Sequence, residues 1–178
     1  MARNVEIKAR IESIDLILPR AAALADNGPI EIIQDDTFFV CSNGRLKLRV
    51  FSPERGELIF YSRANQKGPK ECSYFISPTN SPGTLRETLS LACGQVGRVR
   101  KNRTLYLVGR TRVHLDRVEG LGDFLELEVV LEEGESVESG EAVARDLMQK
   151  LHIQPNQLLE GAYIDLLLAG NQPTGSLA

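Results

Sequence analysis

Apolar and polar residues alternate along several segments of this chain, which is the pattern of β-strands that bury one face. From Asn4 to Ile11 every second residue is apolar, and the residues between them are polar or charged. Seven later segments have strand-like patterns, and they are residues 31–40, 45–51, 57–63, 70–76, 96–108, 112–118 and 124–131. Short turns such as Ser42-Asn43-Gly44 favour antiparallel pairing. About eight strands of this length predict a closed or nearly closed barrel.

Four segments have helical patterns instead, and they are residues 14–25, 82–93, 138–151 and 158–168. Ser13 and Ser81 stand at N-cap positions, and a proline follows Ser81 at the first helical position. The expected fold class is α+β, a single eight-stranded antiparallel β-barrel with helices packed outside it. We expect one domain over residues 1–169 and a disordered tail over residues 170–178. Tyr163 and Asp165 are expected to anchor the last helix.

The composition indicates which classes of binding partner and which cellular compartment to expect. The 178 residues carry a net charge of -3, so no overall basic field indicates a nucleic-acid partner. The first residues lack the apolar stretch of a signal peptide, and no segment approaches the length of a membrane span. The three cysteines have no metal-type spacing, which predicts free thiols in a reducing compartment. We therefore expect a cytoplasmic protein without a nucleic-acid or membrane partner.

The charged residues share strand faces, because side chains two positions apart point to the same side of a strand. These faces carry Glu6, Lys8 and Arg10; Arg45, Lys47 and Arg49; Lys101 and Arg103; Arg112, His114 and Asp116; and Glu126 and Glu128. A charged sheet face is ordinarily just solvated. Here, however, cationic strands stand beside an anionic one, although like charges opposite each other destabilise a sheet. If helices cover the apolar faces from outside, the charged faces must point into the barrel.

A barrel interior rich in arginine and lysine needs an anion, because unpaired buried charge is costly. Phosphate suits such a site, since arginine meets its oxygens in pairs and lysine adds a compact point charge. Several cations favour a polyphosphate over a monophosphate. Carboxylates beside that anion are typical ligands of Mg²⁺ or Mn²⁺, which bind carboxylates together with substrate phosphates.

In order along the chain, these segments resemble the CYTH superfamily, which groups class IV adenylyl cyclases with thiamine triphosphatases and inorganic triphosphatases, the triphosphate tunnel metalloenzymes. Residues 5–10 resemble the N-terminal ExExK strand of that family, and residues 45–49 resemble its basic third strand. Residues 101–103 and 112–116 look like later tunnel strands. Residues 119–128 are similar to the hairpin and carboxylate strand of the class IV adenylyl cyclase-like branch.

The resemblance implies an eight-stranded tunnel that binds a triphosphate and a divalent metal. Its metal positions fall on Glu6, Glu126 and Glu128, with a looser match at Asp116. Its phosphate contacts fall on Lys8, Lys47, Arg49, Lys101, Arg103 and Arg112, with looser matches at Arg63 and Lys70. Arg10 and Arg45 share these charged faces and complete the candidate substrate-binding set. Lys8 and His114 are the catalytic candidates, and His114 as a proton carrier or as a histidine bonded to a neighbouring carboxylate stays open.

One position departs from the motif. Asn4 stands where ExExK has its first glutamate. An asparagine can still supply an oxygen ligand, but it removes a negative charge. The departure leaves the number of metals, and full activity, open.

Two reactions fit these residues. In hydrolysis, which we place first, a water attacks the terminal phosphorus of a nucleoside, thiamine or inorganic triphosphate. In cyclisation, the 3′-hydroxyl of ATP attacks the α-phosphorus and yields cyclic AMP and pyrophosphate. Both reactions need the same clamp, because positioning and electrostatic stabilisation dominate phosphoryl transfer. A non-catalytic binder of polyphosphate or nucleotide is a third hypothesis, and a homodimer is left open.

Overall fold

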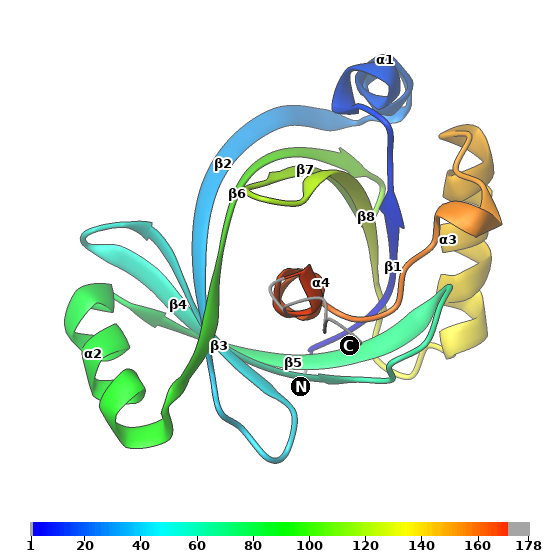
Figure 1. The fold of residues 1–178 in the computed structure, drawn as a ribbon. Helices are drawn as coiled ribbons and strands as arrows, with labels where there is room; N and C mark the ends of the chain where they lie inside the picture. Colours follow the sequence, from blue (N-terminus) through cyan, green and yellow to red (C-terminus); the bar gives the residue numbers. More distant parts are fainter. Residues whose placement is uncertain (1, 171–178) are drawn as a thin grey trace, which may run out of the picture.

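Eight antiparallel strands close into a barrel in the computed structural model, which describes residues 2–170. The strands are β1 (Ala2–Arg10), β2 (Asn27–Phe39), β3 (Arg45–Ser52), β4 (Arg55–Arg63), β5 (Lys70–Thr79), β6 (Gln95–Val108), β7 (Thr111–Val118) and β8 (Gly122–Val130). Around the ring they follow the order β1-β5-β4-β3-β2-β6-β7-β8, and every neighbouring pair is antiparallel (Figure 1). The predicted closed antiparallel barrel is confirmed.

The helices pack outside the barrel strands, as predicted. They are α1 (Ile14–Leu24), α2 (Pro82–Cys93), α3 (Val137–Lys150) and α4 (Tyr163–Gly170), with a short 3₁₀ turn at Pro155–Gln157. Helices α1 and α3 pack against the outside of β1, β7 and β8, whereas α2 contacts the other side of the barrel at β2 and β3. Viewed along the barrel axis, α4 lies across the opening of the ring (Figure 1). Helix α4 therefore covers one end of the barrel.

Several predicted boundaries differ from the structure by a few residues, and the largest differences lie at the starts of β2 and of the last helix. Strand β2 begins at Asn27 rather than at residue 31, because it follows the long strand β6 as far as the pair Asn27–Leu107. The last helix begins at Tyr163 rather than at residue 158, because the preceding segment pairs with β1. Strand β5 leaves β1 after Glu6, and the backbone N–H of Leu159 then donates to the carbonyl of Lys8 at 2.9 Å. The extended segment thus satisfies a backbone edge that no strand covers.

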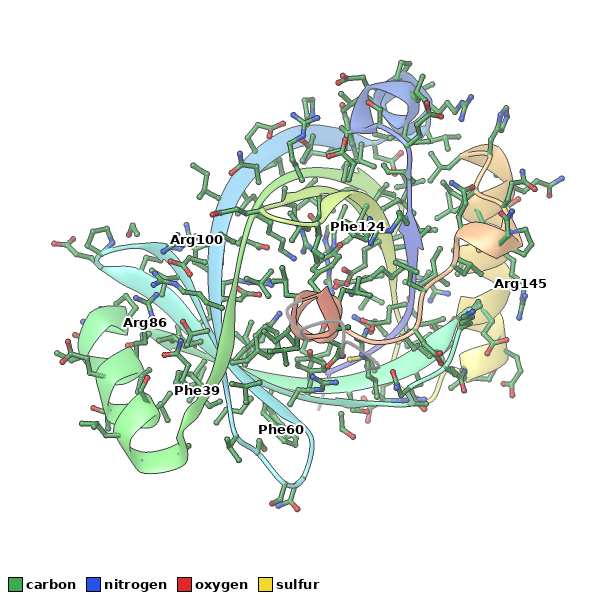
Figure 2. The ribbon with its side chains drawn as sticks, in the orientation of Figure 1. Phe39, Phe60, Arg86, Arg100, Phe124 and Arg145 are labelled. Atoms are coloured by element: carbon green, nitrogen blue, oxygen red, sulfur yellow. The ribbon has the colours of Figure 1, made fainter. Side chains whose placement is uncertain are left out.

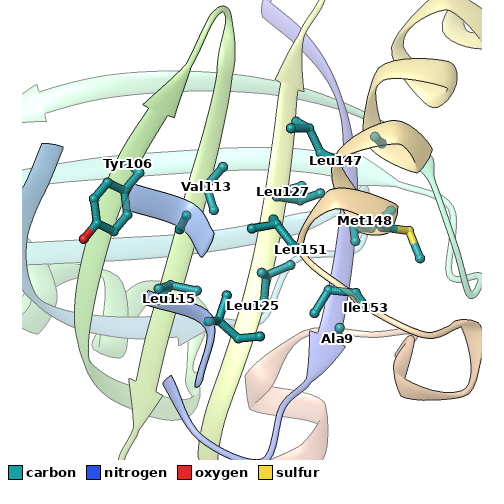
Figure 3. Close-up of a cluster of buried hydrophobic side chains, with 14 of the residues drawn as sticks. Ala9, Tyr106, Val113, Leu115, Leu125, Leu127, Leu147, Met148, Leu151 and Ile153 are labelled. Atoms are coloured by element: carbon teal, nitrogen blue, oxygen red, sulfur yellow. The ribbon is translucent and has the colours of Figure 1, made fainter. Parts of the chain in front are cut away.

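The main hydrophobic core lies outside the barrel, between the strands and the two helices α1 and α3. The outward faces of β1, β7 and β8 supply alternate apolar residues, and α3 lays its apolar face against them (Figure 3). Examples with no exposed surface are Val5, Ile7, Val113, Leu115, Leu125, Leu127 and Leu151. Each buried side chain of this size contributes roughly 1.5–3 kcal/mol relative to an exposed one. The inner faces of the same strands are left to the charged residues.

The described residues end with α4, whose last residue is Gly170. The tail predicted for residues 170–178 lies outside the described residues from position 171 onward. Within residues 2–170, no helix is long and apolar enough to cross a membrane.

Helix α3 approaches the barrel closely at Gly140. A Cβ at this position would meet side-chain atoms of Leu131 and Val5 at 2.7 Å. We expect Gly140→Ala to lower the free energy of unfolding by about 1–2 kcal/mol, because overpacking outweighs the helix propensity of alanine. Gly83 of α2 has no atom within 4 Å of such a Cβ, so Gly83→Ala is the matched control. Urea unfolding of both variants measures the difference, and an equal or stabilising effect at Gly140 would contradict this packing.

Candidate active site

The barrel encloses a cavity of about 300 Å³, into which side chains from all eight strands and from α4 project (Figure 2). The sequence-predicted residues that line it are Glu6, Lys8, Lys47, Arg49, Arg63, Lys101, Arg103, Arg112, His114, Glu126 and Glu128. They come together because each occupies an inward position of its strand. The expected sorting of faces, apolar outward and charged inward, holds on β1, β7 and β8. On β6 the outward neighbours Arg100 and Asn102 are polar, and on β2 and β4 the apolar residues Phe38 and Ile59 point inward.

Buried carboxylates hold the basic residues in place on two sides of the cavity. On one side, Asp36 of β2 accepts a two-bond contact from Arg49 at 2.8 Å and a third bond from Lys47 at 3.0 Å. Burial alone would raise the pKa of Asp36, but the charges of Arg49 and Lys47 outweigh it and hold the pKa well below its usual range. Asp36 is therefore an internal counterion that orients two cations.

Asp116 is the counterion on the other side. Its carboxylate accepts bonds from Lys101 at 3.1 Å, from Arg103 at 2.6 and 2.7 Å, and from the hydroxyl of Tyr163 at 2.9 Å. Asp116 is fully buried and does not line the cavity. The sequence analysis had placed it among the metal ligands, but the structure surrounds it with cations instead. Burial and the neighbouring Arg103 lower the pKa of Lys101 to about 7, so Asp116 does not fully compensate the charge of this ammonium group.

Three groups stand where a divalent metal could bind. One ligand atom each from His114, Glu126 and Glu128 lies within 4.8 Å of the others. Glu6 faces Glu128 across the β1–β8 pair, but its carboxylate contacts Arg63. Burial raises the pKa of Glu6, Arg63 lowers it, and Glu126 and Glu128 raise it again. The pKa of Glu6 therefore lies above its usual value.

The donors in this group fit a hard divalent cation. Carboxylate oxygens are the ligands that Mg²⁺ and Mn²⁺ prefer. Asn4 adds an oxygen on the same wall of the cavity. Its Oδ1 is buried and has no hydrogen-bond partner among the described residues. An oxygen of this kind is costly to bury unless something binds it, which agrees with a ligand in the cavity.

The two catalytic candidates lie beside this group. The ammonium of Lys8 is 3.8 Å from a carboxylate oxygen of Glu126 and 4.0 Å from the ring centroid of Tyr163. Burial and Arg103 lower the pKa of His114 to about 4, so its imidazole is neutral near pH 7. Its Nδ1 is 3.8 Å from Glu128, beyond hydrogen-bonding distance, and has no partner among residues 2–170. The bonded-histidine alternative therefore gains no support.

Three of the predicted substrate contacts lie outside the cavity wall. Arg10 stacks on Phe124 and donates to the carbonyl of Leu121, and Arg45 donates to Asp165 of α4. Lys70 is buried, but its ammonium donates to the carbonyl of Gln66. Each of the three cations begins or ends its strand at the barrel end that α4 covers. Alternation places them on the charged face, but it does not indicate how far the lumen extends along that face.

The sequence analysis missed some of the residues that form the wall. Gln34 and Asp36 occupy inward positions of β2, and Tyr163 reaches the cavity from α4. Alternation within residues 31–40 was the available signal, because it places both polar side chains on one face with the apolar residues at positions 32 and 38. Tyr163 anchors the last helix as expected, through its bond to Asp116, and its ring also contacts Lys8 and Lys101.

Removal of one internal counterion tests this electrostatic arrangement. We expect Asp116→Asn to lower the free energy of unfolding by about 3–5 kcal/mol, because it leaves two buried cations without their partner. Asp35→Asn is the matched control on the outer face of β2, where Asp35 accepts a bond from Arg98 at 2.6 Å. Its loss should cost less than about 1 kcal/mol. Equal losses in urea unfolding would mean that the interior pairs are as well hydrated as the surface pairs.

Similar folds occur among solved structures. The chain matches PH1012 protein from Pyrococcus horikoshii OT3 with a TM-score of 0.81 and 23% identity, covering 92% of this chain and 98% of the other. It matches HpAC1 from Hippeastrum, whose structure is reported to reveal a dominant triphosphatase activity, with a TM-score of 0.66 and 16% identity, over 96% of this chain and 98% of the other. At these identities the matches support the fold.

The sequence itself also matches known proteins. It is 27% identical to adenylate cyclase CyaB of Aeromonas hydrophila over 170 residues, which covers 90% of this chain and 86% of that relative. The family model of the CYTH domain matches residues 2–163, which include all eight strands and the segment that leads into α4. The resemblance drawn from the charged strand faces is thereby confirmed, and the chain belongs to the CYTH family.

Proposed function

We propose that this protein is a triphosphatase that hydrolyses a triphosphate in the barrel cavity with the help of Mg²⁺ or Mn²⁺. One observation carries the proposal. Seven basic residues and the group His114, Glu126 and Glu128 line the same cavity of about 300 Å³. Charged residues that interact only with solvent are expected on an open surface rather than in a cavity, because burying unpaired charge is costly. Asp36 and Asp116 each pair with one lysine and one arginine of this set, and an anion of matching size would meet the donors that still face the cavity.

The internal counterions prepare the cations for that anion. Asp36 bonds Nε and Nη2 of Arg49, which leaves the Nη1 group available to a phosphate oxygen. Asp116 holds Arg103 in the same way through Nε and Nη2. The guanidinium groups are therefore fixed before the substrate binds, and little side-chain entropy remains to be lost. Fixed donors of this kind can stabilise charge that develops in the transition state.

The carboxylates and the catalytic candidates complete the site. A bound divalent cation would offset phosphate charge and orient a water, which is its general role in phosphoryl transfer. Glu126, Glu128 and His114 would hold it, with Asn4 as a further oxygen donor. Lys8, fixed between Tyr163 and Glu126, would donate to an oxygen of the reacting phosphate. The neutral imidazole of His114 would keep a lone pair for the metal, which a cationic histidine would not have.

Cyclisation of ATP is the second candidate reaction. It is favoured by one observation, the 27% identity to adenylate cyclase CyaB of Aeromonas hydrophila over 170 residues. Both reactions would use the same basic residues and carboxylates, and they differ in which phosphorus meets the nucleophile. Hydrolysis ranks first because it needs only water and no dedicated pocket that positions the adenine base.

Product analysis tests the proposed activity. ATP, thiamine triphosphate and tripolyphosphate are each incubated with the protein and Mg²⁺ or Mn²⁺, and the products are separated by ion-exchange chromatography. We expect release of inorganic phosphate, and Glu128→Gln should abolish it while the protein stays folded. Because Glu128 also pairs with Arg112, the unfolding transition of the variant is measured alongside. Glu31→Gln is the matched control, because Glu31 lies on the outer face of β2 and bonds Thr104. Cyclic AMP and pyrophosphate as the main products would favour the cyclase, and no turnover with any of the three would contradict both reactions.

Binding of the triphosphate has a separate readout in thermal stability. Tripolyphosphate should raise the melting temperature markedly, since a ligand at 100 times its Kd stabilises the folded state by about 2.7 kcal/mol. Orthophosphate should raise it far less, because it spans only part of the basic set. Arg49→Ala should weaken tripolyphosphate binding by roughly 1.5–3 kcal/mol, whereas Arg100→Ala on the outer face, about half exposed, should not. Equal, small shifts for both anions at matched ionic strength would show that the basic face is only solvated.

A further inference from the structure

Helix α2 is loosely attached to the barrel. It packs on the outside of β2 and β3, the strands that carry Asp36, Lys47 and Arg49 (Figure 1). Of the 12 residues of α2 only Pro82 is buried, whereas α3 buries its apolar face on the other side of the barrel. The wall formed by β2 and β3 therefore has the weaker outer layer, and a covalent link to α2 would strengthen it.

Two cysteines come next to each other where α2 leads into β6. Strand β2 pairs with the start of β6, and beyond the last pair the backbone N–H of Val40 donates to the carbonyl of Gly94 at 3.0 Å. The next residue after Val40 is Cys41, and the residue before Gly94 is Cys93, the last residue of α2. Directly opposite residues of an antiparallel pair have Cα atoms roughly 4.5–5.5 Å apart, a separation that a disulfide spans. The pairing of β2 with β6 thus brings together two thiols that are far apart in the sequence.

The two cysteines lie on facing sides of β2 and α2. Phe38 lines the cavity, so Cys41, three positions later, is on the opposite, outer side of the strand, where α2 packs. Cys93 follows Leu89 by one helical turn, on the side of α2 where Leu85 and Leu89 are partly buried. Both thiols are free, and Cys41 is partly exposed and Cys93 exposed. A small oxidant can therefore reach them.

We infer that Cys41 and Cys93 form a reversible disulfide that joins the end of α2 to the turn between β2 and β3. The oxidant is a low-molecular-weight disulfide such as oxidised glutathione. The thiolate of the exposed Cys93 attacks one of its sulfur atoms and releases one small thiol, and the thiolate of Cys41 then attacks the Sγ of Cys93 and releases the second. The two protein thiols lose two protons and two electrons, which the two released small thiols carry away. An excess of small thiol reverses the exchange, since exposed disulfides are the readily reduced ones.

The third cysteine of the chain is an internal reference. Cys72 lines the cavity and is buried, and its burial and the charge of Glu6 raise the pKa of its thiol to about 12. The thiolate is the form that attacks a disulfide. We therefore expect Cys72 to stay reduced under conditions that oxidise the other two cysteines.

Reaction of the reduced protein with oxidised glutathione tests the inference. Iodoacetamide then blocks the remaining thiols, and mass spectrometry of the tryptic peptides identifies the link. We expect a peptide pair joined through Cys41 and Cys93, and an alkylated Cys72. The link closes a loop of about 50 residues and should raise the melting temperature by about 4–10 °C. Dithiothreitol should reverse this rise.

Single replacements of the three cysteines are the matched controls. Cys41→Ser and Cys93→Ser should each take up glutathione at the remaining partner without a link, and their melting temperatures should not rise on oxidation. Cys72→Ser should still form the link. Glutathione adducts on both Cys41 and Cys93 of the wild-type protein without a link would overturn the inference, and so would a link between two chains, seen as a dimer on a non-reducing gel. A link that left the melting temperature unchanged would overturn the stabilisation of α2.

Discussion

The whole structure depends on enclosing cations within a protein interior. Burying a charge without a partner is costly, and the lumen holds several arginines and lysines. The fold meets this constraint with Asp36 and Asp116, two buried carboxylates that each receive bonds from an arginine and a lysine. Their pKa values are held well below the usual range, so both stay ionised. Without them, the unliganded barrel would contain uncompensated positive charge on both walls.

The same constraint explains why the hydrophobic core lies on the outside. Charged side chains occupy the inner faces of β1, β7 and β8, so these strands bury their apolar residues on their outer faces. A smaller apolar cluster that includes Phe38, Ile59 and Tyr163 lies on the cavity side. Helices α1 and α3 supply the second layer over β1, β7 and β8, and a close approach at Gly140 brings α3 onto the barrel. The walls that carry Glu6, His114, Glu126 and Glu128 are therefore the walls that the core supports most firmly. Rigid support of this kind fixes the donor atoms of a site.

Much of the fold and the site followed from alternation. Residues 124–131 could be assigned an inward acidic face and an outward apolar face, and the structure has Glu126 and Glu128 inside and Leu125 and Leu127 in the core. Alternation has no information on depth along the axis, so it could not separate Lys70 or Arg10 from the residues of the lumen. It also has no information on register across strands. The pairing of Arg103 with Asp116 decides that this aspartate serves as a counterion, and only the fold reveals it.

The position of helix α4 depends on long-range contacts, which no local sequence pattern encodes. Its position follows from Leu159, which pairs with the free edge of β1, and from Tyr163, which reaches Asp116 across the barrel. Both are contacts between residues far apart in the sequence. The segment 158–162 has an apolar, helix-like composition, yet unsatisfied backbone groups on β1 hold it extended.

Helix α4 lies across one end of the barrel, and this restricts access to the lumen. In the part of the chain that the structure describes, a ligand of the lumen would enter and leave at the opposite end. If the proposed hydrolysis takes place there, the product nearer that end would have to leave before the deeper one. The deeper product would then delay the next turnover, a form of product inhibition that a barrel open at both ends would not have.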